Sequence, residues 1–390
     1  MNILFLSSWY PSKKNPNFGI FIKEHAHAIH NAGNNIVVVS LIILKDKHLF
    51  KYSKSDFRDE HGVRTIQIEI NSSLKDYLYY LIFFQYFVVL KAVNDLIKSG
   101  FKPDIIHSNV IYSAGIMGNW LARRFHLPHV ITEHWSRMEN FMSKPVLSGW
   151  AKNSYQRAEI IIPVSEFLKN KILSTTRILN NANFQVIGNV VDSETFKFLK
   201  REKNSNEIRF CAIATWANKK NPDKLPELII EALSLFQKET GKKILLNMIG
   251  GGDKVPELRK LCNDKGLDTH FTGYISKTEI ASYLQKSDFF IHASTIETFG
   301  IVVAESLLCG TPVICSNVGA LPELIDDSNG VLCNNSIEDW INGLRVVTTK
   351  NYQLEMTSDQ ITLRLSLHSI GNQYSEVYKQ SIQKFKQKNL

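Results

Sequence analysis

The chain has 390 residues, of which 44% are hydrophobic and 21% are charged. These fractions are ordinary for a soluble globular protein, and they exclude a disordered, collagen-like or low-complexity chain. At roughly 100–200 residues per domain, the length predicts two or three domains.

The net charge of +9 is unevenly distributed. Residues 1–190 hold 22 lysines and arginines against 13 aspartates and glutamates, whereas residues 191–390 hold 24 of each kind. A basic first half indicates an anionic partner, such as nucleic acid, phosphorylated lipid or an acidic membrane surface; scattered solvated lysines are the alternative.

Three further features bear on compartment and membrane. The five cysteines are odd in number and none have C-x-x-C spacing, so we expect a reducing compartment without disulfides or a zinc knuckle. Residues 1–7 lack a basic region and predict a strand rather than a signal peptide. The apolar segment 77–90 is shorter than the roughly 20 residues that span a bilayer. It predicts a buried core helix, with a helix lying on the membrane surface as the alternative.

Short β-branched runs alternate with helical patterns along the chain, which predicts parallel sheets covered on both faces. In the first half we expect strands at residues 3–7, 36–43, 65–70, 104–107, 129–133, 160–164 and 185–187. Helices are expected there at residues 21–31, 74–98 and 113–125.

The segment 200–207 (KREKNSNE) has no apolar residue and predicts a linker, after which the alternation restarts. Strands are expected at residues 208–214, 244–249, 270–272, 289–292 and 313–315. Helices are expected at residues 226–239, 256–265, 278–285, 302–308 and 337–347.

The sequence therefore predicts an α/β protein with two doubly wound, Rossmann-like domains. We expect an acceptor-side domain at residues 1–200 and a donor domain at residues 201–370. A C-terminal helix is expected at residues 371–390, with packing back on the first domain as one option. Because ligands bind beyond the carboxyl ends of parallel strands, a ligand is expected in a cleft between the domains.

The densest chemical signal is the segment 294–312, which follows a predicted strand and opens a helix. A helix start offers free N–H groups and the positive end of the helix dipole, which suit a phosphate. Within the segment, Glu297 and Glu305 have seven residues between them. Eight helical steps would separate them by roughly 12 Å, too far for the carboxylate pair of a glycosidase. We expect them to hold two parts of one long ligand, since carboxylates accept hydrogen bonds from sugar hydroxyls. Each glutamate alone also fits a helix-end charge or a surface residue.

This segment resembles the Glu-x7-Glu motif of the retaining glycosyltransferases of family 4, which have the two-lobed GT-B fold. Other blocks of the family follow in order over residues 1–345. They are the opening strand with Pro11 and the loop at residues 18–21, residues 103–107, 132–134, 158–165 and 186–192, the glycine run 250–252, and residues 271–274. The resemblance implies a hexosyltransferase-type enzyme that moves a sugar, with retention, from a nucleotide-diphosphate donor to an acceptor hydroxyl.

The resemblance also implies roles for single residues. Glu305 would hold the donor ribose, and Glu297 would hold hydroxyls of the transferred sugar. His134 would lie near the anomeric carbon. Lys220 would offset the charge that grows on the leaving diphosphate, which is a large catalytic effect in a dry cleft. Without the resemblance, His134 fits a structural histidine and Lys220 a solvated charge.

Where the family has a phosphate-binding arginine, this chain has Thr215. Lys219 or Asn218 would compensate for the lost cation. The other implied donor-side residues are Thr298, Phe299, Gly300, Ile301, Gly251, Tyr274 and Ile275. Phe18 and Gly19 would form the acceptor-side loop, in which the glycine permits a close approach of the backbone.

We expect no cofactor besides the sugar nucleotide as co-substrate, with UDP or GDP as the nucleotide. No metal is expected, because the sequence has no clustered His, Asp and Cys set and no Asp-x-Asp. The expected partners are the donor, a glycan or lipid-linked acceptor and an anionic membrane surface, and not nucleic acid. The expected setting is cytoplasmic and peripheral at the inner membrane face, in the synthesis of capsule, lipopolysaccharide or exopolysaccharide. A nucleotide-sugar epimerase on the same fold and a non-catalytic sugar-binding protein remain as alternatives.

Overall fold

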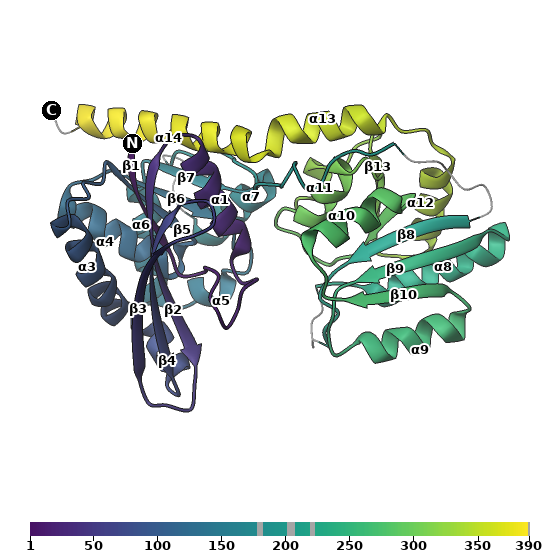
Figure 1. The fold of residues 1–390 in the computed structure, drawn as a ribbon, viewed down its shortest axis with the longest axis horizontal. Coiled ribbons are helices and arrows are strands. Elements are labelled where there is room, and N and C mark those ends of the chain that lie inside the picture. Colours follow the sequence, from purple (N-terminus) through teal and green to yellow (C-terminus); the bar gives the residue numbers. More distant parts are fainter. Residues whose placement is uncertain (178–181, 201–206, 219–222, 389–390) are drawn as a thin grey trace. The chain divides into compact units, whose positions relative to one another are not determined.

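A computed structural model describes all residues except 178–181, 201–206, 219–222 and 389–390 (Figure 1). It divides into two compact units, one formed by Met1–Val190 with Leu367–Leu390 and the other by Val191–Ser366. The division falls ten residues before the expected boundary at residue 200, because Val191 already donates a backbone hydrogen bond to Leu365 of the second unit. The predicted linker 200–207 therefore belongs to the second unit, and residues 201–206 of it lie outside the described residues.

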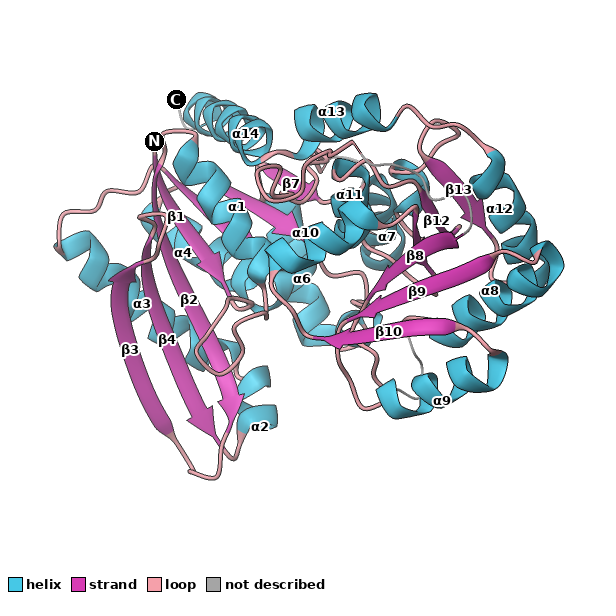
Figure 2. Cartoon of the chain, turned by 45° about the vertical axis from the view of Figure 1, so that its right-hand side comes forward, coloured by secondary structure: helices cyan, strands magenta, loops and turns pink. Residues whose placement is uncertain are grey.

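The first unit has a seven-stranded sheet in the order β3-β4-β2-β1-β5-β6-β7. Figure 2 shows β3, β4 and β2 of this sheet side by side. Its strands are β1 (Asn2–Ser7), β2 (Asn35–Lys45), β3 (Lys51–Arg58), β4 (Arg64–Ser72), β5 (Ile105–Asn109), β6 (His129–Glu133) and β7 (Ile160–Pro163). All neighbours are parallel except the antiparallel pair β3–β4. The chain moves outward in one direction from β1 to β2 and β4, and in the other from β5 to β7. The order therefore reverses between β1 and β5, which is where a parallel sheet opens a crevice.

The helices of this unit follow the predicted alternation. They are α1 (Ile20–Asn31), α2 (Lys75–Tyr80), α3 (Ile82–Lys98), α4 (Ile116–Phe125), α5 (Glu139–Met142), α6 (Pro145–Arg157), α7 (Glu166–Thr176) and α14 (Leu367–Lys388), with a short π-helical turn at Ile111–Gly115. The C-terminal helix α14 begins four residues before the expected start, and it packs against α1 and crosses it at a steep angle (Figure 1).

Hydrogen bonds fix α14 to the interior of the first unit. The hydroxyl of Tyr378 lies 2.7 Å from Nδ1 of His107 on β5, and the hydroxyl of Tyr374 lies 2.9 Å from Nδ1 of His25 on α1. All four side chains are buried. Burial lowers the pKa of His25 to about 3, so this ring is neutral at physiological pH.

Three sequence predictions for the first unit differ from the structure. Strand β3 was missed because its side chains are all exposed, which leaves no hydrophobic pattern to read. Residues 185–187 form no strand and only donate backbone hydrogen bonds to β7. The single helix expected at 74–98 is divided at Leu81 into α2 and α3. In addition, the segment 77–90 is not a fully buried core helix, because several of its aromatic side chains are exposed.

The second unit has a six-stranded sheet, parallel throughout, in the order β10-β9-β8-β11-β12-β13. Its strands are β8 (Glu207–Ile213), β9 (Lys243–Ile249), β10 (Asp268–Gly273), β11 (Phe289–His292), β12 (Val313–Ser316) and β13 (Gly330–Cys333). Its helices are α8 (Pro226–Thr240), α9 (Val255–Lys265), α10 (Lys277–Lys286), α11 (Ile301–Leu308), α12 (Ile337–Thr349) and α13 (Leu354–Leu365), with a short 3₁₀ turn at Leu321–Glu323. Here the order reverses between β8 and β11, which again predicts a ligand crevice at their carboxyl ends.

The contact between α14 and α1 leaves no room for a side chain at Gly371. A Cβ there would lie 2.1 Å from the carbonyl oxygen of Ala28. We expect Gly371→Ala to lower the free energy of unfolding by about 1–3 kcal/mol, because overpacking outweighs the gain in helix propensity. Urea denaturation measures this. The matched control is Gly149→Ala in α6, where nothing lies within 4 Å and stability should be unchanged or higher. Equal stability of the two variants would contradict the close α1–α14 packing.

Candidate active site

Three side chains of the second unit meet where β11 ends and α11 begins. His292 is the last residue of β11, and Glu297 lies in the loop before α11. Nε2 of His292 lies 2.8 Å from Oε1 of Glu297. The ammonium of Lys224 pairs with the same carboxylate oxygen and lies 3.2 Å from Nε2 of His292. We call this group the Lys224–His292–Glu297 cluster.

Backbone hydrogen bonds place Lys224 in the cluster. Residues 223–225 run antiparallel to residues 293–295, with a bridge between Lys224 and Ser294. Leu225 donates to the carbonyl of Ala293 at 3.1 Å, and Thr295 donates to the carbonyl of Asp223 at 2.9 Å. Lys224 is therefore held in register with the loop that carries Glu297, directly before α8 begins at Pro226.

Glycines hold the other side of the Glu297 loop. The carbonyl of Glu297 accepts a hydrogen bond from the backbone of Ala320 at 3.0 Å. Gly319, with φ of 59°, packs so tightly that a Cβ would lie 2.0 Å from the same carbonyl. Gly300 begins α11 with φ of 92°, and a Cβ there would meet Leu321 at 2.7 Å. Both positions require the conformational freedom of glycine, so the loop has one tightly defined path.

The cluster determines the charge of Glu297. Burial raises the pKa of this carboxyl, but the hydrogen bond from His292 and the positive charge of Lys224 outweigh burial and lower the pKa to about 2. Burial and the charge of Lys224 lower the pKa of His292, against the opposing effect of Glu297. At neutral pH the cluster therefore holds an ionised Glu297 and a neutral His292.

A cavity of about 180 Å³ adjoins the cluster at the carboxyl end of β8. Its lining comes from the loop after β8, the segment before α8 and the start of α9. The lining residues are Thr215, Trp216, Ala217, Asp223, Lys224, Pro226 and Lys254. Two lysines thus face one crevice at the point where the strand order reverses. Lys254 also pairs with Glu227 on α8.

The glycine run 250–252 packs against the loop after β8. A Cβ at Gly250 would lie 1.9 Å from the carbonyl oxygen of Ala214, and one at Gly252 would lie 1.9 Å from that of Trp216. A Cβ on Gly251 would meet the Tyr274 ring at 2.6 Å, while the rest of Tyr274 is exposed. These glycines bring three loops together at the carboxyl ends of β8, β9 and β10.

The structure distributes the other predicted donor-side residues around this edge of the sheet. Glu305 lies half-buried on α11, and Ile301 is the first residue of that helix. Thr298 is half-buried and Phe299 is buried in the loop before it. The exposed Asn218 donates its backbone N–H to Asp253 at 2.8 Å. Ile275, half-buried, follows Tyr274 in the loop before α10.

The structure does not test the predicted phosphate lysine. Lys219 and Lys220 lie outside the described residues, and the lysine that the structure brings to Glu297 is Lys224. The prediction of Lys220 rested on the family resemblance of residues 214–221. Counting back from Pro226, which begins α8, would have selected Lys224, and His292 could have been found as the last residue of the predicted strand 289–292.

His134 follows β6 in the first unit and is buried against the rings of Phe21 and His25, with centroids 4.8 Å and 5.2 Å away. Burial and the neighbouring histidines lower the pKa of His134 well below its ordinary value. Neither ring nitrogen makes a hydrogen bond of ordinary geometry to a described residue, although the Asn189 side chain approaches closely enough to raise the pKa slightly. The ring is therefore neutral and has free nitrogens.

The preceding Glu133 fixes the backbone that presents His134. Its fully buried carboxyl group accepts four hydrogen bonds, from the backbone N–H groups of Ile111, His134 and Trp135 and from the Tyr155 hydroxyl. Burial raises the pKa of Glu133, and the four donors oppose that shift. The loops after β5 and β6 are thus tied together by one side chain.

The expected acceptor-side loop borders a second cavity. Phe18 is half exposed, and its ring lies 5.9 Å from that of Trp9. Gly19 has φ of 71°, and a Cβ there would lie 2.4 Å from the Trp9 carbonyl oxygen, so this glycine permits a close approach to the protein's own backbone. The cavity, of about 300 Å³, is lined by Ser8, Trp9, Asn15, Phe18, residues 41–44 of β2, Lys75, Gln85, Tyr112 and Ser113. It lies beside the carboxyl end of β1, at the reversal of the first sheet.

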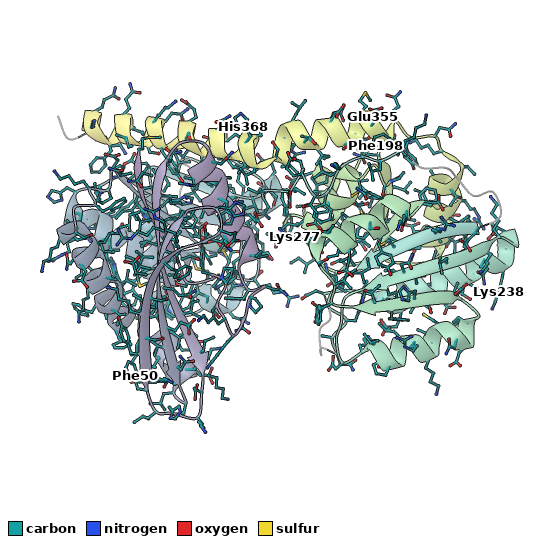
Figure 3. All side chains as sticks on the ribbon, viewed as in Figure 1. Phe50, Phe198, Lys238, Lys277, Glu355 and His368 are labelled. Carbon is teal, nitrogen blue, oxygen red and sulfur yellow. The ribbon has the colours of Figure 1, made fainter. Side chains whose placement is uncertain are left out.

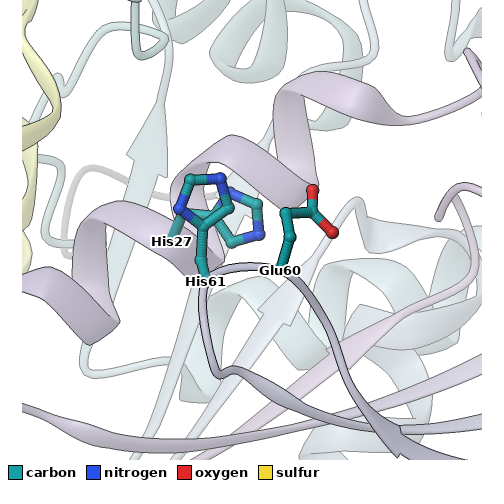
Figure 4. A group of neighbouring side chains, drawn as sticks. All are labelled: His27, Glu60 and His61. Atoms are coloured by element: carbon teal, nitrogen blue, oxygen red, sulfur yellow. The ribbon is translucent and has the colours of Figure 1, made fainter.

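One group in the described part of the chain has the composition of a metal site, which the sequence did not reveal. His27 on α1 and the pair Glu60 and His61 in the β3–β4 turn place ligand atoms within 4.8 Å of one another (Figure 4). However, Lys23 donates to Glu60 at 2.7 Å, and Nε2 of His27 is 2.8 Å from Asp59. The lysine already neutralises the carboxylate that a cation would need, so we assign no metal to this group.

Two family models cover most of the chain. The model for glycosyl transferases group 1 matches residues 193–361, and the model for glycosyltransferase family 4 matches residues 19–195. The chain belongs to the group 1 glycosyltransferases. The predicted family resemblance and the predicted GT-B fold are confirmed.

The similar proteins share this assignment at low identity. An uncharacterized glycosyltransferase of Methanocaldococcus jannaschii is 27% identical over 281 residues, which are 70% of this chain and 71% of that protein. The alpha-monoglucosyldiacylglycerol synthase of Streptococcus pneumoniae is 26% identical over 59% of this chain and 56% of its own length. This glycosyltransferase therefore spans only a little over half of that relative.

Solved structures support the fold over nearly the whole glycosyltransferase. The sucrose-phosphate synthase of Thermosynechococcus elongatus has a TM-score of 0.72 and 16% identity, covering 97% of this chain and 99% of that one. HepE of Anabaena, solved with UDP, has a TM-score of 0.67 and 18% identity, covering 97% and 100%. At these identities the likeness establishes the fold alone.

Removing the Lys224 charge should change how stability depends on pH. In the wild type the pKa of Glu297 is about 2, below its ordinary 4.5, so its stabilising effect is complete above pH 4.5 and is lost as the pH falls toward 2. In Lys224→Met the positive charge no longer opposes burial, so the pKa of Glu297 is higher than in the wild type. We expect the free energy of unfolding at pH 7 to fall by roughly 2–4 kcal/mol.

At pH 3 the difference in unfolding free energy between the wild type and Lys224→Met should be roughly half its value at pH 7. The reason is that the wild type itself loses part of the stabilisation from the ionised Glu297 at this pH. Urea denaturation at pH 7 and pH 3 measures both values. Lys260→Met, at an exposed lysine of α9, is the matched control and should leave the pH profile unchanged. A deficit independent of pH would show that Lys224 does not control the ionisation of Glu297.

Proposed function

We propose that this glycosyltransferase moves a hexose, with retention of anomeric configuration, from a nucleotide-diphosphate sugar to a hydroxyl of a glycan or lipid-linked acceptor. The observation that carries the proposal is the Lys224–His292–Glu297 cluster beside a lysine-lined cavity at the strand reversal of the second unit. The second unit binds the donor and the first unit binds the acceptor.

The charges of the cavity suit a diphosphate. Lys224 and Lys254 both line it, and each is paired with a carboxylate in the protein alone. A diphosphate that enters brings oxygens that these ammonium groups can also contact, so the leaving group is met by cations in a crevice with reduced solvent access. The helix start at Gly300 adds backbone N–H groups that have no acceptor within α11. Lys224 takes the role that the sequence assigned to Lys220, and Thr215 lines the same cavity without supplying a charge.

The ionisation of Glu297 restricts its role. With a pKa of about 2 it carries no proton to give at neutral pH, and its bonds to Lys224 and His292 reduce its basicity and nucleophilicity. Such a carboxylate is suited to accept hydrogen bonds from sugar hydroxyls and to fix the orientation of the sugar. This supports a retaining mechanism in which the acceptor attacks the face that the nucleotide leaves, with no covalent intermediate on Glu297.

The first unit offers a neutral His134 and an apolar cavity with polar groups at one side. Oγ of Ser113 lies 2.9 Å from Oγ of Ser8 and donates to Gln85 at 2.6 Å. The apolar walls come from Trp9, Tyr112 and β2. An acceptor with both a hydroxyl-bearing and an apolar part would match this lining.

The names of relatives favour the same substrate classes. Alpha-monoglucosyldiacylglycerol synthases of Streptococcus pneumoniae and Acholeplasma laidlawii act on a lipid, as their names state, and the structural neighbour WaaB is a lipopolysaccharide outer core galactosyltransferase. HepE was solved with UDP and with UDP-glucose. We therefore propose a uridine nucleotide as the first donor to test, with guanosine nucleotides next, and a role in cell-surface glycan or glycolipid synthesis.

A screen of melting temperature against nucleotide diphosphates and their sugars tests the donor assignment, because a ligand that binds only the folded protein raises its melting temperature. The donor found is then incubated without acceptor. Conversion of the donor to its epimer would instead support a nucleotide-sugar epimerase. Binding of free sugar with no binding of any nucleotide would overturn the proposal in favour of a sugar-binding protein.

The two motif glutamates should separate binding from turnover. Glu305→Ala is expected to weaken nucleotide binding about 10- to 100-fold, because it removes a charged hydrogen-bond acceptor for the ribose. Glu297→Ala is expected to lower kcat about 10- to 100-fold with a smaller effect on nucleotide affinity. Calorimetry with the nucleoside diphosphate and steady-state kinetics measure the two effects.

Two controls accompany these variants. Glu297→Gln keeps the shape of the side chain and tests whether its charge matters. Glu257→Gln, at an exposed position in α9, should behave as the wild type. Wild-type binding and turnover in both motif variants would remove the basis of the donor assignment.

A further inference from the structure

The segment that the sequence presented as an apolar helix has two different faces in the structure. On α2 and α3 the large side chains of Tyr77, Phe83 and Phe87 are 65%, 55% and 63% exposed. Gln85 and Val89 of the same segment are buried. Phe83 and Phe87 are four positions apart on α3, so these two side chains share one outward face, and Tyr77 is exposed on the preceding helix α2. An exposed group of large apolar side chains of this kind marks an interaction surface.

Aromatic contacts extend this face onto two neighbouring helices. The Phe83 ring stacks on Trp120 of α4 at 4.9 Å and meets Trp150 of α6 at 5.0 Å. The two tryptophans lie 5.3 Å apart, and Tyr86 lies 5.3 Å from Trp120. We call this connected set, with Tyr77, Tyr80 and Phe87, the aromatic surface. Tryptophan and tyrosine are the residues that prefer the boundary between lipid and water.

The same helices carry an excess of positive charge. Residues 75–98, 116–125 and 144–157 together hold eight lysines and arginines and two aspartates. The ammonium of Lys144 lies 3.5 Å from the centre of the Tyr80 ring. Arg124 is near enough to Tyr86 to lower the pKa of its hydroxyl, against the larger, opposite effect of burial. Some of the positive charge of the first unit therefore lies directly beside the aromatic surface.

The inward face of α3 belongs to the cavity of the first unit. Lys75 and Gln85 line that cavity, and Gln85 accepts the hydrogen bond from Ser113. One short helical segment therefore separates the expected acceptor cavity from the aromatic surface. None of the helices in the described part of the chain has the length and apolar character that a bilayer crossing needs.

We propose that the aromatic surface docks on an anionic phospholipid bilayer, with α2 and α3 lying in the headgroup region. The proposal rests on the sugar transfer proposed above, whose acceptor would be lipid-linked and would reach the cavity past the same segment. Aromatic side chains enter the boundary of the acyl chains, and the surrounding lysines and arginines contact lipid phosphates. Positive charge selects an anionic bilayer over a second copy of this chain, whose identical basic surface would repel it.

Vesicle sedimentation with the full chain tests the proposal. The vesicles are phosphatidylcholine alone or an equal mixture of phosphatidylglycerol and phosphatidylcholine. The apolar variant is Tyr77→Ser with Phe87→Ser, and its control is Leu363→Ser on α13, an apolar residue of the second unit that is 78% exposed. The charge variant is Lys144→Glu with Arg124→Glu, and its control is Lys238→Glu on α8 (Figure 3).

We expect the wild type and both controls to bind the mixed vesicles more tightly than phosphatidylcholine, with binding that weakens as salt rises. The apolar variant should lose about tenfold or more of its partition into mixed vesicles. The charge variant should lose about 25-fold or more on mixed vesicles and little on phosphatidylcholine, since each of the two removed cations contributes about a factor of five near an anionic surface.

Vesicle binding by both variants at the level of the wild type would overturn the proposal. So would a dimer of the wild type, seen by sedimentation velocity, that the apolar variant loses while no vesicle binding occurs. Nucleotide-dependent melting of the same variants keeps the two proposals separate. Vesicle binding without any nucleotide binding would overturn the proposed transfer reaction and leave the docking surface. Nucleotide binding without any vesicle binding would overturn the docking surface and leave the transfer reaction.

Discussion

An ionised carboxylate can be buried only where other groups replace the water that it loses, and the second unit is arranged around one such carboxylate. Glu297 keeps its charge because His292 and Lys224 both reach the same oxygen. His292 comes from a strand end, and Lys224 from a segment held in backbone register with the Glu297 loop. The tight glycines at 300 and 319 fix that loop from the other side. The site is thus built by backbone geometry, and its electrostatics follow.

The first unit also buries a carboxyl group but surrounds it with different partners. Glu133 is also buried beside a strand end, but its four partners are neutral donors, and its pKa is raised. All four of those bonds join protein segments to each other, so no capacity is left for a ligand. Glu297 shares one oxygen between His292 and Lys224, and Lys224 is a cation. The two carboxyl groups therefore differ in the charge of their partners, and the pKa is lowered for Glu297 and raised for Glu133.

The sequence predicted the features that burial determines and missed those that loop length and tertiary contacts determine. Buried parallel strands such as β1, β2 and β11 were found because continuous β-branched runs reflect burial on both faces. β3 was missed because an exposed edge strand has no such run. The Glu-x7-Glu motif was found because its position relative to a strand and a helix is fixed. Lys224 and the His27–His61 contact were missed because loop length and tertiary approach decide them, and neither is encoded in local spacing.

The segment 77–90 shows how one pattern can have two physical meanings. A run of apolar residues long enough for four helical turns fits a core helix equally well as an interfacial one, because composition does not record which face is covered. In the structure the helix is divided at Leu81, and Gln85 is buried and accepts a hydrogen bond from Ser113. The rest of the inward face of α3 is apolar, and Phe83 and Phe87 are exposed on the same helix. Under the proposed docking on a bilayer these exposed aromatic side chains meet lipid, and one helical segment borders both the cavity of the first unit and the aromatic surface.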